Sequence, residues 1–466
     1  TAMVPFLKDP YDARARIARA NVPAYVREEV IPGMVEAFRI QSENWGFEWY
    51  SEWTSYRSGP DQERLSVALS DGDTWFHGRP PKKAHSGISI QVCGRTTETY
   101  DTLADRLLSS FHHELFHNLQ RNLYQHLAGR EEVAGAMEAW AYFSEGTAVL
   151  ASSVGRADAE TGAPGGDFAS RINAYLGQGS LIGSDLNASY LTMNPYHAGA
   201  YWRFLYEQCG QTDEGAIDPR RGMRLVRRVL EILYAGDVVD IASSTDLVGM
   251  TPKILDRALL GSPCPFDSHA TSLTAFASAL YGLGTDSGRR GAQDALPRWA
   301  FIEPQAAYVN PPIDTFDYSE GSAFKGEIPS SFGFDFLDIV LGPAFDGRPL
   351  TVVVHSRGGT ASFGLEVWEL KDQKRGVSSG FALANAARPL VIRRTTVVSG
   401  NVPVRAATTV ASTTGDGRAV PGTDYAYRVP SVDSTLADRL AIIITRTDAN
   451  EQVDPTGSYT VELRQS

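Results

Sequence analysis

Cysteine is scarce in this chain: only three occur among 466 residues, Cys93, Cys209 and Cys264. So few cysteines exclude a disulfide scaffold and any cysteine-rich metal site. One bridge between Cys209 and Cys264 is one option and three buried free thiols are the other, because spacing alone does not determine pairing.

Long apolar runs are also missing. No stretch approaches the roughly 20 residues that a helix needs to cross a bilayer, and the best candidates, near Leu350 and Leu440, have the length of strands. Basic residues are fewer than acidic ones, 43 against 55, and the formal charge is −12. No basic run with interleaved aromatic residues could follow a phosphate backbone. We therefore expect no membrane span and no nucleic-acid partner.

The overall composition is that of a globular protein, with 42% hydrophobic and 21% charged residues. A chain of this length is expected to divide into two or three domains. It opens with Thr1 rather than Met and shows no charged-then-apolar leader, as in a mature or trimmed form.

Three patterns follow one another along the chain. Residues 1–100 combine helical spacing with alternating strands, residues 101–304 carry Leu, Ala, Arg and Glu at helical period, and residues 305–466 are short strands separated by turns. These patterns predict an α+β fold. The N-terminal helix and sheet and the helical block form one catalytic domain, and an all-β sandwich follows it.

One segment contains the pattern His113-Glu114-x-x-His117. Two histidines at i and i+4 on a helix lie on one face and can share a metal ion, while the Glu between them is offset toward the open coordination position. A third protein ligand is needed, and the next helical stretch offers Glu138 and Glu145 on one face. We favour Glu145, because Gly146 and small residues follow it and let a second helix approach the first. Glu138 is the second choice, or a partner for a histidine N–H.

These residues resemble the gluzincin group of metallopeptidases, in which His-Glu-x-x-His is followed on the next helix by a ligand Glu. His113-Glu-Leu-Phe-His117 is similar to the first motif. Two further blocks are similar to the Asn-Glu-Gly-Phe-Ala and Tyr-x-x-Gly-Ala blocks of the aminopeptidase-N-like family: Ser144-Glu-Gly-Thr-Ala148 and Pro195-Tyr-His-Ala-Gly-Ala200.

The resemblance implies a zincin-like catalytic domain with one Zn²⁺ ion held by His113, His117 and Glu145. It makes Glu114 the general base that takes the proton of the attacking water. It also gives Tyr196 a hydrogen bond to the oxyanion of the tetrahedral intermediate.

The block that recognises a substrate's free amino terminus in that family, Gly-Ala-Met-Glu-Asn, is missing here, so an endopeptidase is the more natural activity. The strand before the motif reads Gly87-Ile-Ser-Ile-Gln-Val92. We expect an extended peptide to pair with an exposed edge of this strand. The substrate-binding residues are then Gly87, Ile88, Ile90, Val92 and, after Tyr196, His197.

The C-terminal strand pattern is similar to the pre-peptidase-type modules of secreted bacterial proteases, which implies a secreted, periplasmic or cell-surface location. We expect a monomer that acts on peptides or proteins. Asp71-Gly-Asp73 and Asp448-Ala-Asn450 have the composition of Ca²⁺-binding turns, although such turns are more often solvated. Two other functions stay open: a binding or adhesion protein on a zincin scaffold that has lost catalysis, and a zinc hydrolase of non-peptide bonds.

Overall fold

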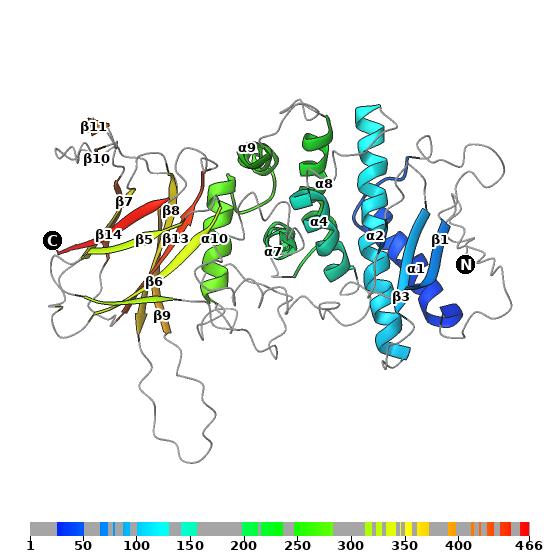
Figure 1. Ribbon diagram of the computed structural model, residues 1–466, viewed down its shortest axis with the longest axis horizontal. Helices are drawn as coiled ribbons and strands as arrows, with labels where there is room; N and C mark the ends of the chain where they lie inside the picture. The colour runs from blue at the N-terminus through cyan, green and yellow to red at the C-terminus, as the bar shows by residue number, and fades with distance from the viewer. Residues whose placement is uncertain are drawn as a thin grey trace, which may run out of the picture.

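The computed structural model describes 26–50, 66–72, 78–79, 87–93, 100–129, 141–155, 198–212, 216–235, 247–282, 313–318, 323–328, 332–341, 345, 350–356, 361–371, 390–397, 412–413, 419–420, 426–432, 439–448 and 457–465. The fold is α+β, as the sequence predicts. Helices occupy the middle of an elongated molecule, a small sheet lies at the N-terminal end, and larger sheets lie at the other end (Figure 1).

The N-terminal part begins with a short helical run, η2 (Val26–Val30), α1 (Ile31–Arg39) and η3 (Ile40–Asn44). Its sheet contains β1 (Ser66–Gly72), β2 (Gly78–Arg79) and β3 (Gly87–Cys93), in the order β1-β3-β2.

The expectation of an exposed edge at β3 is wrong at Ser89 and Ile90, which have neighbouring strands on both sides. β1 pairs in parallel with β3 along its whole length, and β2 pairs antiparallel with Ser89 and Ile90 on its other side. The alternation of residues in a sequence does not reveal which strands become neighbours, so it does not distinguish a central strand such as β3 from an edge strand.

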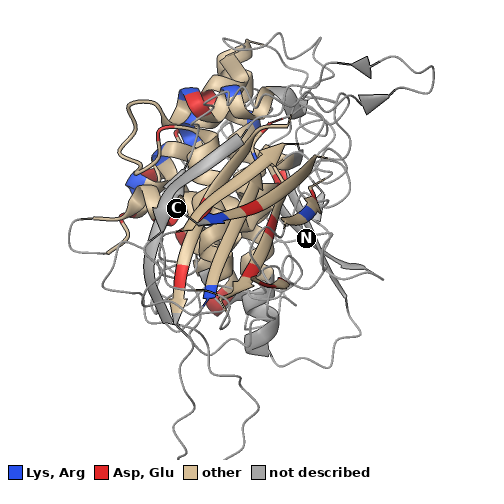
Figure 2. Ribbon diagram, turned by 90° about the vertical axis from the view of Figure 1, so that its left-hand side faces the viewer, with Lys and Arg blue, Asp and Glu red and all other residues tan. Residues whose placement is uncertain are grey.

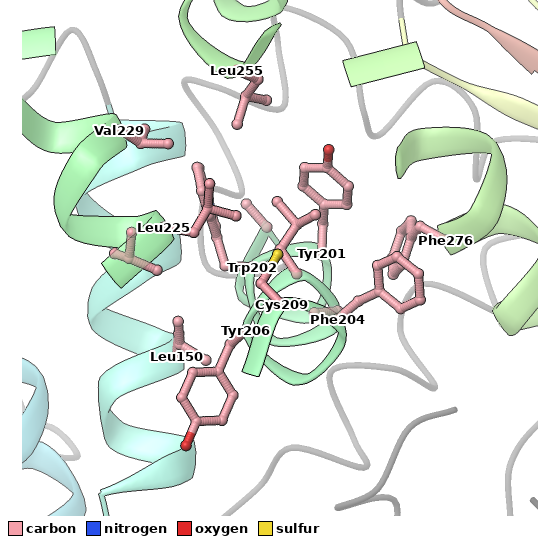
Figure 3. Packing of buried hydrophobic residues seen from close by; sticks show 14 of the residues in the cluster. Leu150, Tyr201, Trp202, Phe204, Tyr206, Cys209, Leu225, Val229, Leu255 and Phe276 are labelled. Atoms are coloured by element: carbon pink, nitrogen blue, oxygen red, sulfur yellow. The ribbon is translucent and has the colours of Figure 1, made fainter. Parts of the chain in front are cut away.

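Within the described residues, the helical part contains α2 (Tyr100–Ala128), α4 (Ala141–Val154), α7 (Ala198–Gly210), α8 (Pro219–Ala235), α9 (Leu247–Leu259) and α10 (His269–Gly282). All 13 residues of α7 are buried. Its aromatic side chains are surrounded by apolar residues of α4, α8, α9 and α10, among them Leu150, Leu225, Leu255 and Phe276 (Figure 3). In the described residues no helix is both long and apolar enough to cross a membrane.

Two features fix α7 within this core. A Cβ atom at Gly146 of α4 would lie 2.6 Å from Trp202 Cδ1 of α7, so the two helices approach as closely as they do because this residue has no side chain. At the other end of α7, Cys209 forms a disulfide with Cys264 in the turn between α9 and α10. Of the two options for the cysteines, the single bridge is therefore the one that the structure shows.

The C-terminal part forms two main sheets and a small hairpin. The five-stranded sheet has the order β4 (Asp314–Asp317), β6 (Phe334–Val340), β13 (Arg439–Arg446), β8 (Phe363–Lys371), β9 (Leu390–Val397). The four-stranded sheet has the order β12 (Ala426–Val432), β7 (Leu350–Ser356), β14 (Ser458–Gln465), β5 (Ala323–Glu327), and β10 (Ser412–Thr413) pairs with β11 (Ala419–Val420).

The central strands of the five-stranded sheet are buried on both faces. Leu337 and Ile442 belong to a hydrophobic cluster that also contains Val352 and other residues of the four-stranded sheet. Their neighbours Phe336 and Ile443 point the opposite way and belong to the core of the helical part. The helices and the strands therefore share one continuous core. The change from helices to strands falls between α10 and β4, outside the described residues, so the division at 304/305 stays a prediction.

Candidate metal centre

Two helices supply the candidate ligands. His113 and His117 lie one turn apart on α2, and Glu145 lies in the first turns of α4, which packs against α2. Phe111, Leu115 and Leu119 on α2 are fully buried, so the hydrophobic core holds this helix with its two histidines directed toward α4.

The three ligand atoms form a small triangle. His113 Nε2 and His117 Nε2 are 3.0 Å apart, and Glu145 Oε2 lies 3.1 Å from the first and 3.2 Å from the second. These three side chains form a group that could hold a metal ion. The structure thus brings together the three residues that the sequence predicts as ligands.

The site is closed on the His117 side and open on the Glu145 side. The His117 side chain is 5% exposed, whereas those of His113 and Glu145 are 15% and 26% exposed. Burial lowers the pKa of His117, but the Glu145 carboxylate outweighs this effect and raises that pKa to about 9. Burial likewise raises the pKa of Glu145, but the two histidines outweigh it and hold that pKa well below its usual range. The carboxylate is therefore ionised at neutral pH and suited to bind a cation.

Glu114 lies beside the triangle on α2. It is only 6% exposed. Its carboxylate has no hydrogen-bond or ion-pair partner within the described ranges; Asn118 Nδ2 donates to its backbone carbonyl instead. Glu114 is also close enough to His117 to favour the protonated imidazole electrostatically. A buried carboxylate with no hydrogen-bond or ion-pair partner among the described residues is suited to accept a proton.

Gln120, one turn beyond His117, was missed in the sequence. It is fully buried, and its Oε1 lies 2.9 Å from His117 Nδ1. Its Nε2 donates to Ser144 O at 2.9 Å and to Thr147 Oγ1 at 2.7 Å, on either side of Glu145. Because the amide oxygen can only accept, His117 Nδ1 carries a proton. In the neutral imidazole that binds a metal, the lone pair is then on Nε2, which faces the candidate metal position. The only sequence signal was a polar residue three positions after a candidate ligand.

Gly146, which follows Glu145, does not lie at the contact between α4 and α2. Gly146 was expected to let α4 approach α2, yet it faces Trp202 and Ala198 of α7. The contact between α2 and α4 beside Glu145 is made instead by the amide of Gln120.

Other predicted site residues lie outside the described ranges or have only their backbone described. Tyr196, His197 and the alternative ligand Glu138 lie outside the described residues. Gly87, Ile88, Ile90 and Val92 lie in β3, whose backbone alone is described. Of the two calcium-type turns, Asp73 and Asn450 lie outside the described residues, whereas Asp448 pairs with Arg446 at 3.2 Å and accepts the backbone N–H of Ser362 at 2.6 Å. These contacts give Asp448 a structural role without any ion.

Comparisons of the chain with protein-family models, with curated proteins and with solved structures find no match. The function must therefore be argued from the residues of the site.

Proposed function

We propose that this chain is a zinc-dependent peptidase of the gluzincin type, acting as an endopeptidase on peptides or proteins. One observation carries the proposal: two imidazole nitrogens and one carboxylate oxygen lie 3.0–3.2 Å apart. Ligand atoms at zinc–ligand distances of 2.0–2.1 Å in a tetrahedron are about 3.3 Å from one another. The spacing and the donor set thus suit Zn²⁺, and three protein ligands leave a fourth position for solvent.

The chemistry divides between the ion and the chain. A zinc ion bound here would lower the pKa of water toward neutrality and polarise the scissile carbonyl. Glu114 accepts the water proton and passes it to the leaving amine, a role that suits a carboxylate with no hydrogen-bond partner in the part of the chain that the structure describes. Gln120 keeps His117 in the tautomer that a metal requires.

The position of α7 supports a role for Tyr196. Ala198, the first residue of α7, contacts Gly146, which directly follows Glu145. Tyr196 precedes Ala198 by two residues, so we propose it as the hydrogen-bond donor to the oxyanion, with His197 nearby in the chain.

The remaining parts of the proposal concern the fold and the cellular setting. We propose that β1–β3 and the helices form a zincin-like domain, and that the two C-terminal sheets, which share a hydrophobic cluster, form a β-sandwich. The Cys209–Cys264 disulfide supports a secreted, periplasmic or cell-surface location, because disulfides persist in oxidising compartments.

The test combines metal analysis with cleavage. The purified chain should contain about one zinc ion and cleave casein or a peptide library, and a chelator should abolish the cleavage. Glu114→Gln should keep the metal and lose hydrolysis by several orders of magnitude. Glu327→Gln makes the same chemical change on an exposed strand of the distant sheet and should leave the activity unchanged.

Two results would reject the proposal: a folded chain that contains no metal and accepts none, or a fully active Glu114→Gln variant. A chain that binds zinc but cleaves no peptide would instead favour the binding protein or the hydrolase of non-peptide bonds.

A further inference from the structure

A basic pocket lies away from the metal centre. It has a volume of about 640 Å³ and lies between the end of α2, the outer face of α8 and the turn after α9. Arg224, Arg227 and Arg228 of α8 line it together with Arg257 of α9. Among the described residues of the lining Glu231 is the only acid, and Arg227 Nε donates to it at 2.7 Å. The lining is therefore strongly positive, although the whole chain has a formal charge of −12.

The arginines are not all used by the fold. Arg224, Arg228 and Arg257 are exposed. Figure 2 shows basic segments, with acidic ones among them, on the helices at its upper left. Arg228 Nη2 reaches two backbone carbonyls at 3.4 Å, which is long for a hydrogen bond. Arg224 makes no hydrogen bond or ion pair with any described residue. At least this guanidinium is available to an incoming anion.

Apolar side chains accompany the arginines. Leu127 and Leu260 are the large hydrophobic residues that stay exposed in the described part of the chain, at 38% and 69%. Leu127 lines the pocket, and Leu260 directly precedes Gly261, which also lines it. An anion surrounded by apolar groups, such as a Glu side chain next to a Leu in a peptide, suits this lining better than a bare inorganic ion.

One wall of the pocket is fixed before any ligand arrives. The turn formed by residues 261–263 leads into Cys264, whose disulfide joins it to the buried helix α7. Arg221 Nη2 also donates to the carbonyl of Pro263 at 3.2 Å. A pre-formed wall reduces the ordering that binding must otherwise impose.

We propose that this pocket binds a peptide segment that carries acidic side chains, with the guanidinium groups of Arg224 and its neighbours pairing with the carboxylates. Leu127 lies ten residues after His117 on α2, about 15 Å along the helix axis. The pocket is therefore separate from the metal ligands, and its binding does not depend on the proposed hydrolysis.

The test measures binding in the presence of a chelator, so that no cleavage occurs. A fluorescent peptide with several Glu residues between Leu and Ser residues should bind to the full chain at low salt, and the same peptide with Gln in place of Glu should not. Arg224→Glu should weaken binding about tenfold, because it removes an attraction and adds a repulsion of similar size. Lys325→Glu makes the same charge change on an exposed position of β5 and should leave the affinity unchanged.

Binding should also weaken as the salt concentration rises, because the pairs are exposed. An affinity that is the same for the Glu and Gln peptides, or that survives Arg224→Glu, would overturn the proposal. So would inorganic phosphate or phosphatidylserine vesicles that bind more tightly than the peptide and displace it, since the pocket would then recognise phosphate.

Discussion

Gln120 provides the sharpest test of how the candidate metal centre is held together. Gln120→Leu keeps the approximate size of the side chain but removes three buried hydrogen bonds: to His117 Nδ1, to Ser144 O and to Thr147 Oγ1. At about 1 kcal/mol for each bond, the substitution should lower the free energy of unfolding by about 3 kcal/mol. It should also weaken zinc binding by about 10- to 100-fold, because His117 loses the partner that sets its tautomer and orientation.

A matched variant separates the metal effect from the loss of stability. Asn122 lies on the same helix and is also buried, and its amide binds the backbone N–H and carbonyl of Tyr50 at 2.7 and 2.9 Å. Asn122→Leu should therefore lower stability by about 2 kcal/mol while leaving zinc affinity unchanged, because it touches no ligand.

The assay is competition for zinc against a chromophoric chelator, with urea unfolding of the same metal-free proteins to measure stability. Both variants should be folded at the temperature of the assay. If Gln120→Leu binds zinc as tightly as the wild type, or if Asn122→Leu loses affinity to the same extent, the assignment of Gln120 as a positioning residue is refuted.

Two further predictions concern the core of the helical part. His269 is 1% exposed and contacts Phe332, and burial lowers its pKa to about 3 from 6.5. Because only the unfolded state binds a proton between these values, stability should fall as the pH drops below about 6.5, by up to about 1.4 kcal/mol per pH unit. Urea unfolding from pH 7.5 to 5 should show a smaller slope for His269→Phe, and an unchanged slope would contradict this cause. The Cys209–Cys264 bridge joins residues 55 apart. Replacing Cys209 by Ala and Cys264 by Ser should therefore lower the free energy of unfolding by about 4 kcal/mol. Urea unfolding of the reduced wild type should show the same loss, and a loss below about 1 kcal/mol would contradict the chain-entropy argument.

The candidate ligands on α2 could be predicted from the sequence because their geometry is local. The spacing of His113 and His117 places both imidazoles on one helical face whatever the rest of the chain does. The observed Nε2–Nε2 distance of 3.0 Å follows from that spacing and from the rotamers of the two side chains.

Glu145 and β3 show where local reasoning fails. Glu145 lies beside the two histidines, as expected, but Gly146 contacts α7 and not α2. For β3, the strand itself was predicted, but its neighbours come from pairings that depend on the tertiary fold: seven register pairs with β1 and two with β2. A pattern within one segment reports which residues share a face and not what lies against that face.

The sequence itself contains a signal of the core that the helices and the strands share. Residues 440–444 read Leu-Ala-Ile-Ile-Ile, and every one of them is buried in β13. A sandwich strand with one solvent face should alternate apolar and polar residues, whereas an uninterrupted apolar run is typical of a strand covered on both sides. Here α10 is the second cover: Thr274 Oγ1 lies 2.7 Å from Thr445 Oγ1, and Ser278 donates to the buried Glu366 at 2.7 Å. The continuous run in β13 therefore argues that the five-stranded sheet packs against the helical part through α10 and is more than an appended module.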